Sequence, residues 1–595
     1  MPVPDHVAAL VQRAAEVVPL PPVVGYLAVE DTGRHRRRQM LLAGRGHVAN
    51  DLVVLDWRSA PLATVFFRHD AGDSYELAVD DRDLDGVVIE RALVEVHGGR
   101  AVALRTERVP ARPPPNEPPA SRGALPVLDP VQQRAVELPA DRGLVVDGEA
   151  GVGKTLVGMY RVAHLARVAA EAGRTWRALV LTPTAGLRRL CRVLADRLGI
   201  VGLDIAIVDD WLLERARAAF RGLPERTSRD AGAEVIRLKR HPAVRIALAA
   251  IARRRHRHDP EEPLSRARGD LLALWGDRQL LEQIAAASDG ALGAREVAAV
   301  AAHTHVQFTT TTEDQHRHVD ADRLVTVDGL RLDEGTPLGD ADSLDVEDAP
   351  VLFELARRRG QRFELPRWDH VFVDEAQLIA PMELAAIGDA VAAGGAVTLA
   401  GDHRQATDDS TAFAGWDPAV AEVGAGDCER VTLAIGYRST PAITAFARAL
   451  VSSPPASLPT PAGDPSLGAT AFAGDLDQIA GVIAALDAAT RAAPWLQIAV
   501  VGRNADHARR LHRELARGLD PVLVLDGEFD FLPGIQVTTI GQVQGLEFDA
   551  VVVPDLAPGF YPERAEVQRG LYVAVTRARG WLWLTTAAAW SPLVA

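Results

Sequence analysis

The chain has 595 residues, of which 48% are hydrophobic and 24% charged, a balance typical of a soluble globular protein with several domains and not of a disordered or fibrous one. Its two cysteines, Cys191 and Cys428, lie far apart without C-x-x-C spacing, which excludes a disulfide framework and a structural zinc site. The formal net charge of −15 argues against nucleic-acid binding through a broad basic surface but not through a local channel.

The first part of the chain is predicted to be a small β-rich domain. We expect a helix over residues 1–20, and then short β-branched and aromatic runs such as DLVVLDW and ATVFF over residues 21–108. Trp57 is expected in the core of this domain. A proline-rich linker follows at residues 109–126, and a second proline-rich stretch occupies residues 452–465. No signal peptide or membrane-spanning segment is apparent, so we expect a cytoplasmic protein without membrane association.

From residue 127 onward the pattern changes to α/β. Apolar strand-like runs (GLVVDG, RALVLTP, HVFVDEA, AVTLAGD, QIAVVG, DAVVVPD) alternate with helical segments, which indicates parallel sheets covered by helices on both faces. The alternation is interrupted over residues 204–364, where helical spacing in the first half and an irregular polar second half predict a mostly helical insertion.

The segment GEAGVGKT follows one strand-like run and precedes a helical one. In such a loop the glycines let backbone N–H groups surround phosphates, Lys154 supplies positive charge to the β- and γ-phosphates, and Thr155 offers a hydroxyl to Mg²⁺. The predicted nucleotide-binding residues of this loop are Gly148, Glu149, Ala150, Gly151, Val152, Gly153, Lys154 and Thr155.

A second strand, HVFV, ends at an acidic pair. Ligands in open α/β sheets lie at the carboxyl ends of the strands, which is where Asp374 and Glu375 stand. We expect Asp374 to hold Mg²⁺ together with Thr155, and Glu375 to orient and deprotonate the water that attacks the γ-phosphate.

Eight segments occur in the order of the UvrD/Rep-like superfamily 1 helicase motifs, and together they extend from about residue 128 to the end of the chain. They are LDPVQQRAV, GEAGVGKT, VLTPTAGLRRL, VDEAQ, AGDHRQAT, GYRST, VQGLEFDAV and LYVAVTRAR. The chain therefore resembles this family. The resemblance implies two RecA-like P-loop NTPase lobes, the first at residues 127–203 and 365–430 and the second at residues 431–595.

The resemblance also implies roles for residues outside the phosphate loop and the acidic pair. Gln132 would read the adenine edge, Tyr437 would stack on the base, and Glu547 would contact the ribose. Gln405 would sense the γ-phosphate, while Arg438 and Arg577 would reach it as arginine fingers from the second lobe. The cofactors implied are ATP and Mg²⁺, and the activity is that of an ATP hydrolase that moves on single-stranded DNA with 3′ to 5′ polarity.

The chain departs from UvrD-like enzymes in three places. Only about a hundred residues separate GYRST from VQGLEF, so the large insertion found there in UvrD-like enzymes is missing. The AGDHRQAT segment lacks the usual aromatic soon after its glutamine, so that Phe413 or Trp416 would have to stack on a base instead or else belong to the core. Gly541 and Gln544 stand where a histidine and a lysine are common.

In these departures, and in the segments VVGYLAVE and DLVVLDWRSAPLATVFF, the chain resembles HelD-like proteins. These are helicase relatives that bind RNA polymerase and release it from nucleic acid. The long N-terminal coiled-coil arm of that group is missing. Three hypotheses stay open: a DNA helicase or single-stranded DNA translocase, a HelD-like factor that remodels RNA polymerase, and an ATPase component of a defence or repair complex.

Two other features, the arginine clusters and the histidine pairs, are not interpreted as binding sites. The arginine clusters GRHRRRQ and ARRRHRHD could contact phosphate but are interpreted as solvated faces. The two H-x-H pairs, formed by His303, His305, His316 and His318, lack the additional ligands that would fix a metal geometry.

Overall fold

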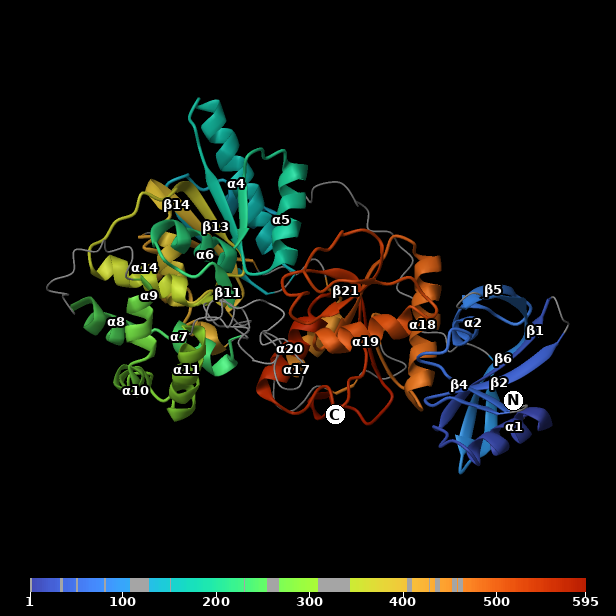
Figure 1. Cartoon of the computed structure of the whole chain (residues 1–595). Helices are drawn as coiled ribbons and strands as arrows, with labels where there is room; N and C mark the ends of the chain where they lie inside the picture. Colours follow the sequence, from blue (N-terminus) through green and yellow to red (C-terminus); the bar gives the residue numbers. More distant parts are fainter. Residues whose placement is uncertain are drawn as a thin grey trace. The chain divides into compact units, whose positions relative to one another are not determined.

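The computed structural model describes residues 3–32, 36–49, 52–79, 82–106, 128–149, 151–228, 231–253, 267–308, 343–403, 409–426, 428–433, 439–451, 457–458 and 464–594. The chain folds as two compact units. Unit 1 comprises Met1–Ala124 together with Tyr437–Ala595, and unit 2 comprises Leu125–Gly436 (Figure 1). The chain therefore passes from one unit to the other twice. None of the described helices is both long and apolar enough to cross a membrane.

Unit 2 is organised around a six-stranded parallel sheet with the order β10-β9-β13-β14-β8-β15. Its strands are β8 (Gly143–Gly148), β9 (Ala178–Thr182), β10 (Asp204–Ile207), β13 (Trp368–Val373), β14 (Val391–Gly401) and β15 (Cys428–Leu433). Every residue of β8 and β9 is buried, as expected for a parallel sheet covered on both faces. The predicted α/β class with parallel sheets is confirmed.

Five helices of unit 2 accompany the strands of the sheet, and local signals set their ends. They are α3 (Pro130–Val136), α4 (Lys154–Glu171), α5 (Ala185–Leu198), α15 (Pro381–Gly388) and α16 (Trp416–Val423). Helix α5 begins where the Thr184 side chain accepts a hydrogen bond from the Leu187 N–H, and it ends at Gly199, whose φ of 70° only glycine adopts readily.

Between β10 and β13 the described residues are mostly helical. The elements are α6 (Val208–Ala219), β11 (Arg226–Ser228), α7 (Ala233–Arg240), α8 (Val244–Arg253), α9 (Ala267–Trp275), α10 (Arg278–Ala286), α11 (Ala294–Gln307), β12 (Ser343–Asp345) and α14 (Asp348–Arg358). Strand β10 opens this stretch and pairs with β9 at the edge of the sheet. One continuous hydrophobic core joins the helices to the sheet.

A fully buried ion network lies among these helices. The Lys239 ammonium donates hydrogen bonds to Asp345, Asp348 and Gln307 at 2.5, 2.8 and 3.3 Å, and the Trp275 indole also donates to Asp348, at 2.8 Å. Burial alone would lower the pKa of Lys239, but the two carboxylates outweigh burial and raise it. Because a buried charge must be paired, the network fixes how α7, α9, α11 and α14 pack together.

The first sheet of unit 1, here called the N-terminal sheet, has the strand order β3-β4-β2-β1-β6-β5, with β7 paired to β6. Its strands are β1 (Val23–Asp31), β2 (Arg37–Ala43), β3 (His47–Ala49), β4 (Leu52–Asp56), β5 (Ser74–Val79), β6 (Arg82–His97) and β7 (Arg100–Arg105). Helix α1 (Asp5–Ala15) packs on this sheet through one hydrophobic cluster, and α2 (Ala63–Arg68) contributes to another.

The second sheet of unit 1, here called the C-terminal sheet, is parallel and has the order β16-β21-β20-β17-β19-β18. Its strands are β16 (Leu467–Ala471), β17 (Gln497–Gly502), β18 (Val522–Leu523), β19 (Gly534–Thr539), β20 (Phe548–Val553) and β21 (Ala578–Thr586). The accompanying helices are α17 (Pro441–Leu450), α18 (Asp475–Ala492), α19 (Ala505–Leu515) and α20 (Ala565–Val575).

The two sheets of unit 1 share a hydrophobic core to which α18 contributes. In Figure 1, α18 lies between the C-terminal sheet and the N-terminal part of unit 1. Trp57, Phe66 and Phe67 of the N-terminal part belong to the same buried cluster as Ile479 and Ile483 of α18. Trp57 is 2% exposed, so its predicted place in a core is confirmed. The N-terminal domain is thus joined to the sheet formed by the last quarter of the chain, although some 360 residues separate Arg105 of β7 from Leu467 of β16 in sequence.

Arginine side chains surround this shared core. Arg68 donates to the backbone carbonyls of Ala516, Arg517 and Leu519, which follow α19, at 3.1 to 3.3 Å. Further contacts across the core include Arg58 to Asp475 at 3.0 Å, Arg105 to Asp477 at 2.8 Å and Arg517 to the carbonyl of Ala60 at 2.9 Å. Cationic side chains at the carboxyl end of α19 also complement the helix dipole.

Candidate nucleotide site

The glycine-rich loop of unit 2 runs from the end of β8 to the start of α4. Gly151 and Gly153 have φ angles of 81° and 88°, a conformation that side-chain-bearing residues rarely adopt. A Cβ at Gly148 would lie 2.8 Å from the carbonyl oxygen of Leu433, so this position also requires glycine. The Lys154 ammonium donates to the carbonyls of Gly148 and Glu149 at 2.9 and 3.0 Å, which keeps its charge over the loop.

The acidic pair stands at the carboxyl end of β13, next to the start of α4. The Thr155 hydroxyl donates to Asp374 Oδ2 at 2.7 Å, although the two residues are 219 positions apart. Burial and the neighbouring Glu375 raise the pKa of Asp374 to about 7, against the opposing effects of Thr155 and Lys154. Glu375 has a φ of 51°, an unfavourable left-handed conformation that the surrounding packing must hold.

This donor set fits a hard divalent cation. Thr155 and Asp374 present a hydroxyl and a carboxylate oxygen within hydrogen-bond distance of each other, and Mg²⁺ prefers oxygen ligands while keeping several of its waters or phosphate oxygens. A fully buried carboxylate with a raised pKa is also one that a cation would stabilise in its charged form.

Gln377 is a central residue of this site to which the sequence analysis gave no role. Its amide nitrogen donates to Glu375 Oε2, and its amide oxygen accepts from the backbone N–H of Asp402 at 3.2 Å. A Cβ at Gly401 would lie 2.0 Å from that same oxygen, so glycine is required for this approach. Gln377 therefore links the acidic pair of β13 to the residues that follow β14.

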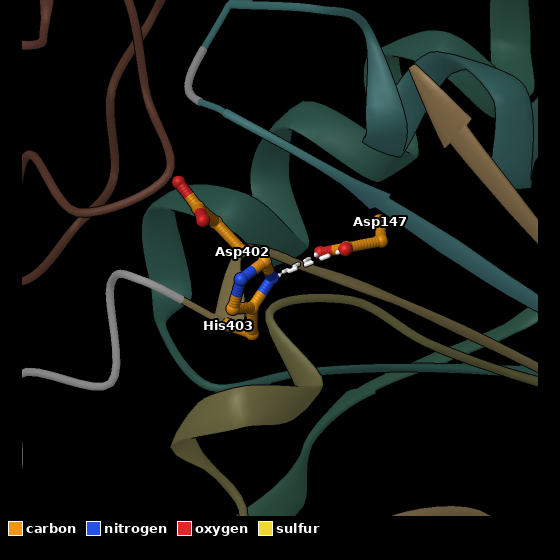
Figure 2. Close-up of side chains that lie close together, drawn as sticks. All are labelled: Asp147, Asp402 and His403. Carbon is orange, nitrogen blue, oxygen red and sulfur yellow. Dashed lines mark hydrogen bonds and ion pairs between the residues drawn. The ribbon is translucent and has the colours of Figure 1, made fainter. Parts of the chain in front are cut away.

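A histidine and two carboxylates lie beside this link, at the ends of β8 and β14 (Figure 2). His403 Nδ1 is 3.0 and 3.1 Å from the two carboxylate oxygens of Asp147. Burial alone would raise the pKa of Asp147, but the contacts with His403 outweigh it and lower the pKa. In Figure 2 the carboxylate of Asp402 points away from this pair. We interpret the His403–Asp147 contact as holding the chain after β14 against the end of β8.

Helix α3 holds Gln132 against the glycine-rich loop. Asp129 caps the helix by accepting from the N–H groups of Val131 and Gln132 at 2.7 and 2.9 Å. The Gln132 side chain in turn accepts from the Asp129 N–H at 3.1 Å and donates to the carbonyl of Val152 at 3.0 Å. The sequence-predicted adenine reader thus lies in the same site as the loop.

The remaining predicted site residues fall into two groups. Ala150, Gln405, Tyr437 and Arg438 lie outside the described residues. Glu547 and Arg577 belong to unit 1, where the Arg577 guanidinium donates to the carbonyls of Val573 and Leu546 at 3.0 and 3.3 Å, and Glu547 lies 3.5 Å from Arg579. Within unit 2 the structure brings together Gln132, the loop, Thr155, Asp374 and Glu375.

Several residues outside the site can also be placed. Trp416 is 4% exposed within the core of unit 2, and Phe413 contacts it edge to face at 5.3 Å. Trp416 is therefore a core residue and not a surface platform for a base. His303 contacts Asp345 at 2.9 Å next to the buried ion network, whereas His316 and His318 lie outside the described residues.

Comparison with known proteins identifies one part of unit 1. Residues 534–585 match the family of UvrD-like helicase C-terminal domains. A solved structure of the C-terminal domain of a possible DNA helicase from Lactobacillus plantarum is 26% identical over 27% of this chain and 93% of that one, with a TM-score of 0.23. No curated protein matches the chain. The matched residues include Glu547 and Arg577, β19, β20 and α20.

Proposed function

We propose that this chain, which carries a UvrD-like helicase C-terminal domain, is a superfamily 1 motor that hydrolyses ATP with Mg²⁺ and moves along single-stranded DNA. The observation that supports it most strongly is the 2.7 Å contact between Thr155 and Asp374. It joins the end of the glycine-rich loop to the acidic pair at the carboxyl edge of one parallel sheet, as metal-assisted phosphoryl transfer requires.

Each residue of this site has a role in the proposed reaction. The loop N–H groups and Lys154 bind the β- and γ-phosphates, while Thr155 and Asp374 hold the cation. Bound Mg²⁺ would neutralise charge on the phosphates. Glu375 orients the attacking water and accepts its proton, and Gln377 holds the Glu375 carboxylate in position.

The resemblance to superfamily 1 helicases suggests further groups for the reaction. We assign Arg438 and Arg577 to stabilising the charge that develops on the γ-phosphate, Tyr437 to stacking on the adenine and Glu547 to the ribose. Gln405 would sense the γ-phosphate. A difference in ATP-binding free energy between two states of the protein would let binding and hydrolysis drive movement.

The substrate on which the motor acts is proposed from the helicase domain. The helicase domain supports nucleic acid, and we propose single-stranded DNA with 3′ to 5′ movement. The second candidate is a HelD-like factor that acts on RNA polymerase. This candidate is supported by the N-terminal domain, because the segment LDWRSAPLATVFF resembles HelD-like proteins. The segment contains Trp57, Phe66 and Phe67, which pack that domain against the C-terminal part of unit 1.

One experiment separates the two candidates. The steady-state ATPase rate is measured alone, with single-stranded DNA and with purified RNA polymerase. A translocase should be stimulated by DNA and unaffected by polymerase. Stimulation by polymerase without any effect of DNA would contradict the DNA translocase and support the HelD-like factor.

A further inference from the structure

Arg161 is a fully buried cation on α4, roughly two turns after Lys154. Its guanidinium donates five hydrogen bonds, each to a backbone carbonyl oxygen. Nη1 donates to Ala135, Val136 and Leu138 at 3.3, 3.4 and 2.8 Å, and Nη2 donates to Pro139 and Arg142 at 3.0 and 2.9 Å. The amino-acid sequence alone does not indicate this role, because an arginine in a helical run is usually a surface residue.

Helix packing alone does not explain an arginine at this position. Burial lowers the pKa of Arg161 to about 10, so the side chain stays charged at neutral pH. Among the described residues, its hydrogen-bond acceptors are all carbonyl oxygens and not carboxylates. Burying a charge in this way is costly, and an apolar side chain would pack on the sheet without that cost. We therefore attribute the presence of an arginine at this position to the backbone carbonyls that its guanidinium binds.

The five carbonyls belong to two segments that adjoin the nucleotide site. Ala135 and Val136 lie in the last turn of α3, where carbonyl groups lack helical partners and a cation complements the helix dipole. Leu138, Pro139 and Arg142 lie in the connection from α3 to β8, which leads into the glycine-rich loop. One guanidinium thus binds both the end of α3 and the approach to that loop.

Helix α3 depends on such anchors because it has only seven residues. A helix of that length is not stable by itself in water. Its first turn is fixed by the Asp129 cap and by the hydrogen bond from Gln132 to the carbonyl of Val152, and its last turn is fixed by Arg161. The place of Gln132 relative to the loop is therefore set from both ends of α3.

We propose that Arg161 is a positioning residue for nucleobase selection. It holds α3 against α4 and thereby keeps the Gln132 amide where it meets the adenine edge. This inference rests on the proposed function, in which the site binds ATP and Gln132 reads the base. The hydrogen bonds of Arg161 go to none of the residues assigned to the phosphates or the cation, so we expect its effect on which nucleotide binds and not on the phosphoryl transfer step.

The test compares ATP and GTP as substrates for the full chain and for Arg161→Met, which keeps an unbranched apolar side chain but removes the guanidinium and its donors. We expect the KM for ATP to rise about tenfold, the effect of roughly one hydrogen bond, while kcat changes little. The preference for ATP over GTP should fall by a similar factor. Arg161→Lys, which keeps the charge but loses the fork, should lie between the two proteins.

Two further variants make the test specific. Arg167→Met changes an exposed arginine of the same helix and should leave both KM values unchanged. In a Gln132→Ala background, Arg161→Met should cause little additional loss of ATP preference, because both changes act on the same contact. An unchanged KM and an unchanged preference in folded Arg161→Met, or additive losses in the double variant, would overturn the proposal.

Binding measurements keep this outcome distinct from failure of the proposed function. Calorimetry with non-hydrolysable ATP and GTP analogues is run on the same variants, with Mg²⁺ present. If the parent chain binds ATP but does not hydrolyse it, the proposed activity is wrong and the Arg161 effect is still read from the two affinities. If the parent chain binds neither analogue, both are wrong.

Discussion

Gln377 occupies the point where the acidic pair of β13 meets the segment after β14. Its side chain is fully buried and is held between Glu375 and the Asp402 N–H. A side chain that contacts the proposed water-activating carboxylate should matter more for the rate of hydrolysis than for ATP binding, because the orientation of Glu375 counts in the transition state.

Gln377→Ala tests this role. We expect kcat for ATP hydrolysis to fall by about tenfold to a hundredfold, the range for a lost positioning contact, with the KM for ATP within about threefold of the parent value. Steady-state kinetics and ATP binding are measured together. The control is Thr411→Val, because the Thr411 hydroxyl donates to the backbone carbonyl of Gln377 at 3.4 Å and not to its side chain. This variant should reduce kcat less than Gln377→Ala does. A normal kcat in Gln377→Ala would show that the carboxylate needs no such support.

At the residue scale, the sequence predicts as candidates the groups that belong to a contiguous motif. The glycine-rich loop, Lys154, Thr155 and Asp374 follow from strand, loop and helix signals that lie within a few residues of each other. Gln377, His403 and Arg161 could not be predicted in their roles, because each acts through partners that the fold supplies. Gln377 and Asp402 are 25 residues apart, and Asp147 and His403 are 256 apart.

At the scale of elements, α7 and α15 are joined by a buried cluster of charges. Arg240 Nε of α7 lies 3.2 Å from Glu383 Oε1 of α15 and 3.3 Å from Glu347 Oε1, so one guanidinium contacts two buried carboxyl groups. Burial raises the pKa of Glu383 from 4.5 to about 7 in spite of Arg240. Burial likewise raises the pKa of Glu347. We therefore expect the contact between α7 and α15 to depend on pH.

The direction of this pH dependence follows from linkage. Because the pKa of Glu383 is higher in the folded protein than in the unfolded chain, the folded state holds an extra proton between pH 4.5 and about 7. The free energy of unfolding should therefore fall as pH rises through this window. The contribution of Glu383 alone is about 3 kcal/mol, on a scale of roughly 1.4 kcal/mol per pKa unit.

Glu383→Gln removes this titration while keeping an acceptor for the Ala380 N–H. We expect the variant and the parent chain to have similar free energies of unfolding near pH 4.5, and the variant to be the more stable protein at pH 8. Denaturant unfolding of both proteins at the two pH values measures the difference. A difference between the proteins that does not change with pH would contradict the assignment.

In the helical segment, the apolar pattern predicts the helices but not the buried charges between them. Apolar spacing predicts helices over much of residues 204–364, and the described part of that stretch is mostly helical. The pattern could not show that Lys239, Asp345 and Asp348 meet in the interior, because a charged residue is usually solvated and its buried partners lie more than a hundred positions away.

At the scale of the whole molecule, the N-terminal domain and the C-terminal sheet form one unit with a common core. Phe67 is 1% exposed, and a Cβ added at Gly518 of the C-terminal part would lie 3.2 Å from the Phe67 Cβ. Composition and the proline-rich linker predict a separate first domain, but they could not predict where it packs, because docking depends on surfaces that form only after each part has folded.

Phe67→Ala tests whether the two parts are stabilised together. Removing a buried phenylalanine should cost about 3–5 kcal/mol, and the loss should extend to α18 because Phe67 shares its core. Hydrogen exchange of the amides over Asp475–Ala492 should therefore accelerate. Val48→Ala, at a position that is 73% exposed in the same domain, is the matched control and should change nothing. Unchanged exchange in α18 of the Phe67 variant would mean that the two parts are stable independently.

The central claim is that the loop and acidic pair of unit 2 hydrolyse ATP. The most direct test is the Mg²⁺-dependent ATPase rate of the full chain beside Lys154→Ala, with Arg167→Met as a surface control on the same helix. The proposed site predicts that the parent chain and Arg167→Met hydrolyse ATP at similar rates and that Lys154→Ala loses at least about a hundredfold, since the lysine charge acts directly on the phosphates. A Lys154→Ala protein that hydrolyses ATP as fast as the parent chain would contradict it.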